Sequence, residues 1–227
     1  MNINTEKIFY DDMQAIRSLL LKKEIPDCYP EDISSIAQLP FANKYYIDRF
    51  DFINISSFAL VSKKWVKPLA DYIGGKKCLE IMAGKGVLSK CLSDYGADIT
   101  ATDNFTWKWH RSKQEKAGRP LGHEELWYAI EDMDCVDSVI KYGSRIGFII
   151  CSWPPYRDNK LHEALLKMRE INSECRLIYI GENRGGCTAD ENFFMEAKII
   201  KDDAGFNYIA GNFQRWQSAD DGIFLIK

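Results

Sequence analysis

Two glycines and two acids stand at spacings that suit the binding of a small polar ligand. Gly84 and Gly86 follow a short apolar run and precede a stretch with helical periodicity. Glycines are needed where a backbone turns sharply against a ligand, and the first turn of a helix offers amides without intrahelical partners. Glu80 precedes the turn, and Asp103 ends the next apolar run, 103 − 80 = 23 residues later. A carboxylate at that position can accept hydrogen bonds from both hydroxyls of an adenosine ribose.

The elements that must position these residues follow a regular order after residue 75. Short apolar runs alternate with helical stretches, which is typical of βαβ units and a parallel sheet. The expected strands are 77–81, 98–102, 128–133, 147–152, 176–181, 206–213 and 222–227, and the expected helices are 87–95, 136–142, 161–171 and 190–201. The sequence therefore predicts an α/β fold with a seven-stranded, mostly parallel, Rossmann-like sheet, helices on both faces and a C-terminal antiparallel hairpin formed by the last two strands.

The first 75 residues have a different character. Apolar residues recur at helical spacing from 5 to 24 and again from 58 to 72, and no segment there alternates as a strand does. The full length of 227 residues fits one domain with an appendage. We expect an N-terminal helical cap over 1–75 and a ligand-binding core over 76–227.

The turn after the first strand resembles a known motif. Glu80-Ile-Met-Ala-Gly-Lys-Gly86 is similar to the acid-x-Gly-x-Gly-x-Gly motif of class I S-adenosylmethionine-dependent methyltransferases, with Met82 at the first glycine position. The resemblance covers 76–227. It implies that Glu80 helps to hold the amino group of the methionine part of the cofactor. It also implies that the turn that binds the cofactor is formed by Met82, Ala83, Gly84 and Gly86.

The same resemblance assigns the rest of the cofactor. It gives the ribose to Asp103 and places Asn104 or Phe105 beside the adenine. Met133-Asp134-Cys135 is similar to the segment that recognises the adenine amino group, with Asp134 as the hydrogen-bond acceptor. Asp132 is an alternative acceptor because strand ends are uncertain by two to four residues in a sequence. Asp134 also suits the N-cap of the following helix.

The end of the fourth expected strand carries the candidate acceptor site. Ser152-Trp-Pro-Pro-Tyr156 resembles the Asp/Asn/Ser-Pro-Pro-Tyr motif of methyltransferases that act on exocyclic amines of bases or on side-chain amides, although Trp153 stands at the polar position. The implied catalytic residues are Ser152, Trp153, Pro154 and Tyr156, and Ser152 also belongs to the cofactor site. A stacking pocket made by Trp153 and Tyr156 is one interpretation, and a proline-ended strand with aromatic residues packed in the core is the other.

Three further side chains have two interpretations each. Glu182 follows the fifth expected strand and either faces the same crevice or is a solvated loop acid. Tyr45 and Tyr46 either close over the cofactor or pack in the core. His110, His123 and His162 show no metal-ligand spacing with one another or with cysteine, so we expect no metal.

The overall composition limits the partners. Lys and Arg total 30 against 33 for Asp and Glu, so the net charge of −3 disfavours nucleic acid as the main partner. The stretch 107–119 has five basic residues and one glutamate, a local excess of 5 − 1 = 4, and is either a solvated surface helix or a site for an anionic or aromatic acceptor, nucleic acid included. Seven cysteines without a C-x-x-C pair predict reduced thiols in the cytoplasm, and no apolar run is long enough to span a membrane.

Together these features predict a methyltransferase that binds S-adenosyl-L-methionine and transfers its methyl group to an unidentified acceptor, a small molecule or a nitrogen of a protein or nucleobase. Two alternatives remain open at this stage. One is a non-catalytic module that binds S-adenosylmethionine. The other is an NAD(P)-dependent oxidoreductase. Glu80 opposes it because the diphosphate of a dinucleotide would gain nothing from a carboxylate there, and Ser89 opposes it because a dinucleotide fingerprint has glycine or alanine at that position.

Overall fold

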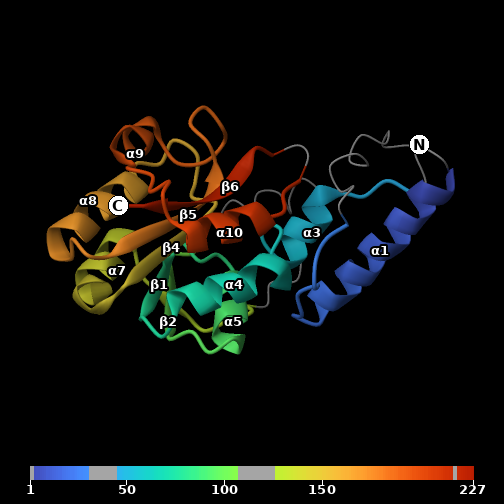
Figure 1. Ribbon diagram of the computed structural model, residues 1–227, viewed down its shortest axis with the longest axis horizontal. Coiled ribbons are helices and arrows are strands. Elements are labelled where there is room, and N and C mark those ends of the chain that lie inside the picture. Colours follow the sequence, from blue (N-terminus) through green and yellow to red (C-terminus); the bar gives the residue numbers. More distant parts are fainter. Residues whose placement is uncertain (1–2, 31–44, 107–125, 217–218) are drawn as a thin grey trace.

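A six-stranded sheet forms the centre of the molecule in the computed structural model, which describes residues 3–30, 45–106, 126–216 and 219–227 (Figure 1). The strand order is β3-β2-β1-β4-β5-β6. Five strands are parallel: β1 (Cys78–Ile81), β2 (Ile99–Asp103), β3 (Ile130–Asp132), β4 (Phe148–Ser152) and β5 (Arg176–Glu182). The sixth, β6 (Asp221–Ile226), runs antiparallel to β5. The expected α/β fold with a mostly parallel sheet is confirmed.

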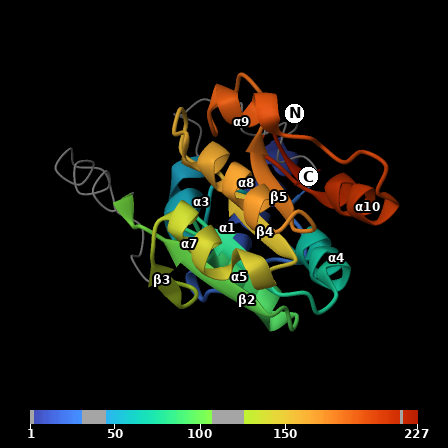
Figure 2. The ribbon, with the colours of Figure 1, turned by 90° about the vertical axis from the view of Figure 1, so that its left-hand side faces the viewer.

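Helices cover both faces of the sheet (Figure 2). One face packs against α4 (Lys63–Ile73), α5 (Val87–Asp94) and α10 (Ala204–Asn212), and the other packs against α7 (Cys135–Tyr142), α8 (Lys160–Ile171) and α9 (Glu191–Glu196). Neighbouring residues of β4 show why. Phe148 and Ile150 belong to the apolar core between the sheet and the first group of helices, and Ile149 and Cys151 belong to the core on the other face. Successive side chains of a strand point to opposite faces, so apolar runs without polar alternation produce a sheet that is buried on both sides.

The expected seventh strand is wrong, and with it the C-terminal hairpin. Residues 206–213 lie almost entirely in α10, whose N-cap Asp203 accepts a 2.9 Å hydrogen bond from the Phe206 amide. Phe206 and Ile209 are both buried, at the i and i+3 spacing of one helix face. The aromatic residues of this segment suggested a strand, but the cap and the spacing of the buried side chains favour a helix. Strand β6 therefore pairs with β5 alone among the named strands.

A short segment after α9 covers the outer edge of β6. The expected helix over 190–201 ends early, since α9 stops at Glu196. Ile199 then forms an isolated antiparallel bridge with Ile226. The Ile200 amide donates to the Leu225 carbonyl at 2.8 Å, and the Lys227 amide donates to the Lys198 carbonyl at 2.9 Å.

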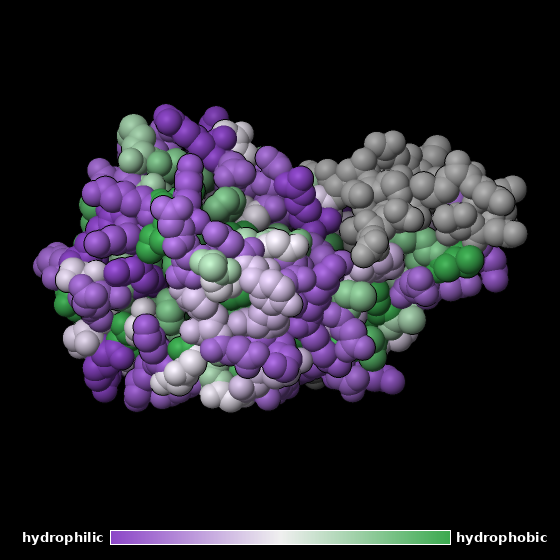
Figure 3. Space-filling view, viewed as in Figure 1, coloured by the Kyte–Doolittle hydropathy of each residue, from purple (hydrophilic) through white to green (hydrophobic). Residues whose placement is uncertain are grey.

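In the described ranges 3–30 and 45–77, three helices precede the sheet: α1 (Ile3–Leu21), α3 (Arg49–Ile55) and α4. The apolar residues of α1 that define its expected periodicity are buried: Phe9, Met13, Ile16 and Leu20. They join one continuous apolar core with α4 and the sheet. Figure 3 shows further hydrophobic side chains along α1, on a face that is otherwise mostly hydrophilic. None of the helices in the described ranges is long and apolar enough to cross a membrane. The division into a cap over 1–75 and a core over 76–227 stays a prediction.

Candidate functional site

The carboxyl ends of the parallel strands place the predicted site residues along one edge of the sheet. Strand β1 lies between β2 and β4, with Glu80 opposite Ala101 on one side and Ile150 on the other. The Ala83 amide donates a 3.0 Å hydrogen bond to the carbonyl of Thr102, which holds the turn after β1 against β2. In open α/β sheets ligands bind beyond this edge.

Asp103 joins the end of β2 to the glycine turn. Its carboxylate accepts hydrogen bonds from two backbone amides, Gly84 at 2.7 Å through Oδ2 and Phe105 at 2.6 Å through Oδ1. The side chain is buried, with the residue 5% exposed. A carboxylate can accept about four hydrogen bonds, so holding the turn does not preclude binding of a ribose diol. The structure thus brings Gly84 and Asp103 into direct contact, whereas the sequence predicts only that both belong to the same ligand site.

The two glycines of the turn have different surroundings. Both adopt left-handed backbone conformations, with φ of 59° at Gly84 and 73° at Gly86. A Cβ added at Gly84 would meet nothing within 4 Å, whereas one added at Gly86 would lie 2.8 Å from the Cβ of Tyr128. Gly84 therefore borders open space where a ligand can lie, and Gly86 lets the start of α5 pack closely against the segment that leads into β3.

Glu80 is held beneath the turn by Ser89 of α5. Its Oε2 accepts hydrogen bonds from both the Ser89 amide, at 3.0 Å, and the Ser89 hydroxyl. Burial raises the pKa of Glu80 to about 7; the bonds from Ser89 oppose this rise, and the negative charge of Asp103 adds to it. Both bonds end on one oxygen, so Oε1 is not engaged by Ser89. No local motif predicts this contact, although a serine at this position differs from a dinucleotide fingerprint.

Strained backbone marks the same edge. Three residues other than glycine have left-handed backbones just beyond strand ends: Met82 (φ 53°) directly after β1, Trp153 (φ 53°) directly after β4, and Phe105 (φ 55°) two residues after the end of β2. Each such residue costs about 1–2 kcal/mol, and such residues cluster at ligand-binding sites. Met82, at the position of the first glycine in the motif, thus has a backbone conformation that favours glycine.

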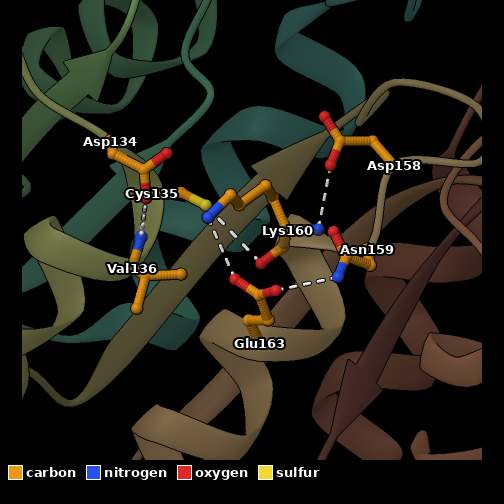
Figure 4. A network of polar contacts seen from close by, with 7 residues as sticks. All are labelled: Asp134, Cys135, Val136, Asp158, Asn159, Lys160 and Glu163. Carbon is orange, nitrogen blue, oxygen red and sulfur yellow. Dashed lines mark hydrogen bonds and ion pairs between the residues drawn. The ribbon is translucent and has the colours of Figure 1, made fainter.

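The adenine side of the predicted site contains a helix cap. Asp134 is the N-cap of α7, and its Oδ1 accepts a 2.9 Å hydrogen bond from the Val136 amide (Figure 4). The start of α8 lies beside it, where the Cys135 thiol donates to the Lys160 carbonyl at 3.6 Å. The capping interpretation of Asp134 is confirmed, and its contact with adenine stays a prediction. Asp132 ends β3 in register with Asp103 and remains the alternative.

Trp153 is fixed by four contacts beyond the end of β4. Its amide donates to the Ile180 carbonyl at 2.7 Å, and its indole Nε1 donates to Asp221 Oδ2 at 3.1 Å. Phe58 stacks on the indole with ring centroids 5.2 Å apart and an angle of 17°, and the Arg49 guanidinium lies 5.4 Å from the ring centroid. The indole is thus packed against residues of the N-terminal segment.

The other residues of this motif have different environments. Pro154 is buried, and Tyr156 lies on the surface, 53% exposed, with the Arg157 guanidinium over its ring. The Ser152 hydroxyl makes no hydrogen bond with the part of the chain that the structure describes, so it is available to a ligand at the strand end. A stacking pocket formed by Trp153 and Tyr156 together stays a prediction.

Glu182 has a role that neither interpretation of the sequence foresaw. It is buried, and each carboxylate oxygen accepts a backbone amide: Oε2 from Cys187 and Oε1 from Asp220, the latter at 3.2 Å. The side chain therefore ties the loop after β5 to the segment before β6. Asp221, opposite Glu182 in the sheet, was missed because no local motif marks it.

The remaining predicted residues are not part of this edge or lie outside the described ranges. The segment 107–119, with His110, and His123 fall outside them. Tyr45 is half-buried, with its ring centroid 5.8 Å from that of Tyr10. Tyr46 is also half-buried. Within the described residues, no group of three or more His, Cys, Asp or Glu side chains could hold a metal ion.

Comparisons with known proteins give a likeness in structure only. No protein-family description matches the sequence, and no curated protein matches it. TehB from Haemophilus influenzae is 15% identical with a TM-score of 0.44, and the match covers 78% of this chain and 65% of TehB. The glycopeptide N-methyltransferase MtfA, in complex with S-adenosyl-L-homocysteine, is 13% identical with a TM-score of 0.44, and the match covers 72% of this chain and 88% of MtfA.

A third solved structure is the magnesium protoporphyrin IX methyltransferase ChlM from Synechocystis PCC 6803 with bound S-adenosylmethionine. It is 14% identical with a TM-score of 0.39, over 71% of this chain and 77% of ChlM. At these identities and TM-scores the likeness concerns the fold, and an activity has to be argued from the residues of the chain itself.

Proposed function

We propose that this protein is an S-adenosylmethionine-dependent methyltransferase. The observation that carries the proposal is the contact between Asp103 and Gly84, with open space beside that glycine. A buried carboxylate at the end of β2 suits a ribose diol, and a glycine turn before α5 gives a small ligand close access to the backbone.

The residues of this edge fit the parts of the cofactor in order. Asp103 would bind the ribose, with Asn104 or Phe105 beside the adenine and Asp134 or Asp132 as the acceptor for its amino group. The carboxyl of Glu80, reached through the turn, would hold the amino group of the methionine part. Burial raises its pKa to about 7, and a nearby ammonium group would favour its ionised form. The Glu80 carboxylate and the ammonium group of the cofactor would thus each stabilise the charge of the other.

The bound sulfonium would supply an already activated methyl group, so the protein has to position an acceptor rather than activate the donor. Pro154 and Pro155 fix the backbone after β4. Trp153, which lies between Ser152 and these prolines, is held in place by its own contacts. The Ser152 hydroxyl lies at this strand end and can hydrogen-bond to the cofactor or to the acceptor. Such a rigid edge suits an in-line transfer, in which the nucleophile, the methyl carbon and the sulfur must align.

Calorimetric titration with S-adenosylhomocysteine and, separately, with NADH tests the proposal. Saturable binding of S-adenosylhomocysteine, with NADH bound weakly or not at all, is expected. Binding of NADH alone would support the oxidoreductase and refute a methyltransferase. Cofactor affinity without turnover on any acceptor would instead support a binding module without catalysis.

A further inference from the structure

The strongest unexplained feature of the molecule is a buried carboxylate oxygen beside Trp153. Asp221 is only 3% exposed, and its Oδ2 accepts the indole hydrogen bond. Its other oxygen, Oδ1, is buried and has no hydrogen-bond partner among the residues that the structure describes. Leaving a buried acceptor without a donor is unfavourable, and more so when the group is charged. A buried polar atom of this kind calls for a partner, and the residues that the structure describes do not supply one.

The surroundings restrict the chemistry of that partner. Glu182 lies opposite Asp221 in the sheet, and both of its oxygens already accept backbone amides. Arg49 is attracted by both carboxylates, while burial lowers its pKa. Two carboxylates and one guanidinium leave a net negative charge in this group. A hydrogen-bond donor that is neutral or positive is therefore favoured, and an anion is disfavoured.

The location relates this oxygen to the proposed reaction. Asp221 contacts Trp153, which directly follows Ser152 at the carboxyl end of β4. Phe58, which stacks on the same indole, is 45% exposed, so aromatic surface reaches solvent beside Trp153. A ligand that approaches this edge can thus combine contact with an aromatic surface and a hydrogen bond to a carboxylate.

We propose that Asp221 Oδ1 binds an N–H group of the methyl acceptor, and that the acceptor is therefore an amine. This inference rests on the proposed methyltransferase function and narrows it to the nitrogen class. Asp221 is then the residue that selects the acceptor. Arg49 is a positioning residue, which holds Trp153 and Asp221 in place from α3.

Three probes with the same ring test this assignment: benzylamine, benzyl alcohol and benzoate. The full-length protein is labelled with ¹⁵N at its six tryptophans, and the indole signal of Trp153 is assigned from its loss in Trp153→Phe. Benzylamine is expected to shift this signal saturably at neutral pH, benzyl alcohol to bind more weakly, and benzoate to have no effect. Equal responses to all three probes, or no response to benzylamine, would overturn the proposal.

Asp221→Asn is the decisive variant because asparagine can keep an oxygen for the indole while an amino group replaces Oδ1. Benzylamine affinity is expected to fall about tenfold, which corresponds to loss of one hydrogen bond to a charged group. Asp220→Asn is the matched control: it removes the same charge one residue away from an exposed side chain that pairs with Arg215, and it should behave as wild type. An unchanged benzylamine affinity in Asp221→Asn would refute the role of Oδ1.

Titration of the same proteins with S-adenosylhomocysteine separates the two levels of inference. If wild type binds it and Asp221→Asn binds it equally well, the cofactor site is intact and the benzylamine result judges the acceptor site alone. If wild type does not bind it, the methyltransferase proposal fails instead. Should Asp221→Asn not fold, the ranking of the three probes on wild type still decides the inference.

Discussion

The Asp103 carboxylate and the Gly84 amide are joined by a 2.7 Å hydrogen bond, which ties the end of β2 to the turn after β1. The two residues are 103 − 84 = 19 positions apart in the sequence: Asp103 is the last residue of β2, and Gly84 lies in the turn after the neighbouring parallel strand β1. This side chain shapes the turn, and we propose that it also binds the ribose of the cofactor. Loss of this carboxylate should therefore affect ligand binding more than any exposed acid does.

Asp103→Ala is expected to weaken the binding of S-adenosylhomocysteine at least about tenfold, because two charge-assisted contacts to ribose hydroxyls and the anchor of the turn are removed. Calorimetric titration measures the effect. Asp98→Ala is the control, since Asp98 is an exposed acid just before β2 whose ion pair with Lys77 lies on the surface. Unchanged affinity in a folded Asp103→Ala protein would contradict the assignment of the ribose to this residue.

Gly84→Ala should mainly weaken cofactor binding, and Gly86→Ala should mainly lower stability. At Gly84 the new methyl group enters open space, so the cost to stability is about 1–2 kcal/mol from the left-handed backbone alone, while cofactor affinity falls because the methyl group occupies the ligand's place. At Gly86 the same strain is joined by a 2.8 Å approach to Tyr128, so stability falls further. Urea unfolding and calorimetry on both variants check this, and a larger loss of stability in Gly84→Ala would contradict it.

Glu80→Gln should change how stability depends on pH. The pKa of Glu80 is raised from 4.5 to about 7 in the folded protein, so between these values the folded state holds more protons than the unfolded state. Its contribution to stability is therefore lost as the pH rises through this window, by about 3 kcal/mol at most for a shift of this size.

Glutamine cannot ionise, so Glu80→Gln should gain stability relative to wild type as the pH rises from 4.5 to about 7. Thermal unfolding at several pH values measures the difference, with Glu24→Gln as a control for loss of charge at an exposed glutamate. A difference in Tm that stays constant across this range would show that Glu80 does not titrate there.

Trp153 and Asp221 should be energetically coupled. In a double-mutant cycle of Trp153→Phe and Asp221→Ala, the coupling energy is expected to be about 1.5 kcal/mol, because the indole donates to a buried carboxylate. The matched cycle of Trp153→Phe with Asp220→Ala should be additive, since Asp220 is exposed. Equal coupling in the two cycles would mean that the hydrogen bond contributes nothing specific to stability.

Local patterns in the sequence were sufficient to place most of the parallel strands of the sheet. Strands β1, β2, β4 and β5 were placed to within about one residue because each is a short apolar run bounded by polar or glycine residues. The contact between Gly84 and Asp103 follows from this placement, because adjacent parallel strands bring their carboxyl ends together.

The features that were not predicted from the sequence depend on contacts between residues that are far apart in the chain. Arg49 and Trp153 are 153 − 49 = 104 residues apart, and no local motif relates them. The same holds for Trp153 and Asp221, whose contact requires β6 to lie beside β5 and not to form a hairpin with the segment before it. In that segment, 206–213, aromatic residues favoured a strand, but burial of Phe206 and Ile209 on one helix face decided the outcome.

The segment 198–200, which pairs with the last residues of β6, has a consequence for association of the protein with copies of itself. An open strand edge is a template for pairing with other chains and a common start of aggregation. Here the bridge from Ile199 to Ile226 and the two flanking backbone hydrogen bonds occupy one end of that edge. At the opposite side of the sheet, β3 is only three residues long and contains Glu131 and Asp132. The covered end of β6 and the short, acidic β3 are thus poor templates for a further strand, which disfavours edge-to-edge association at these places.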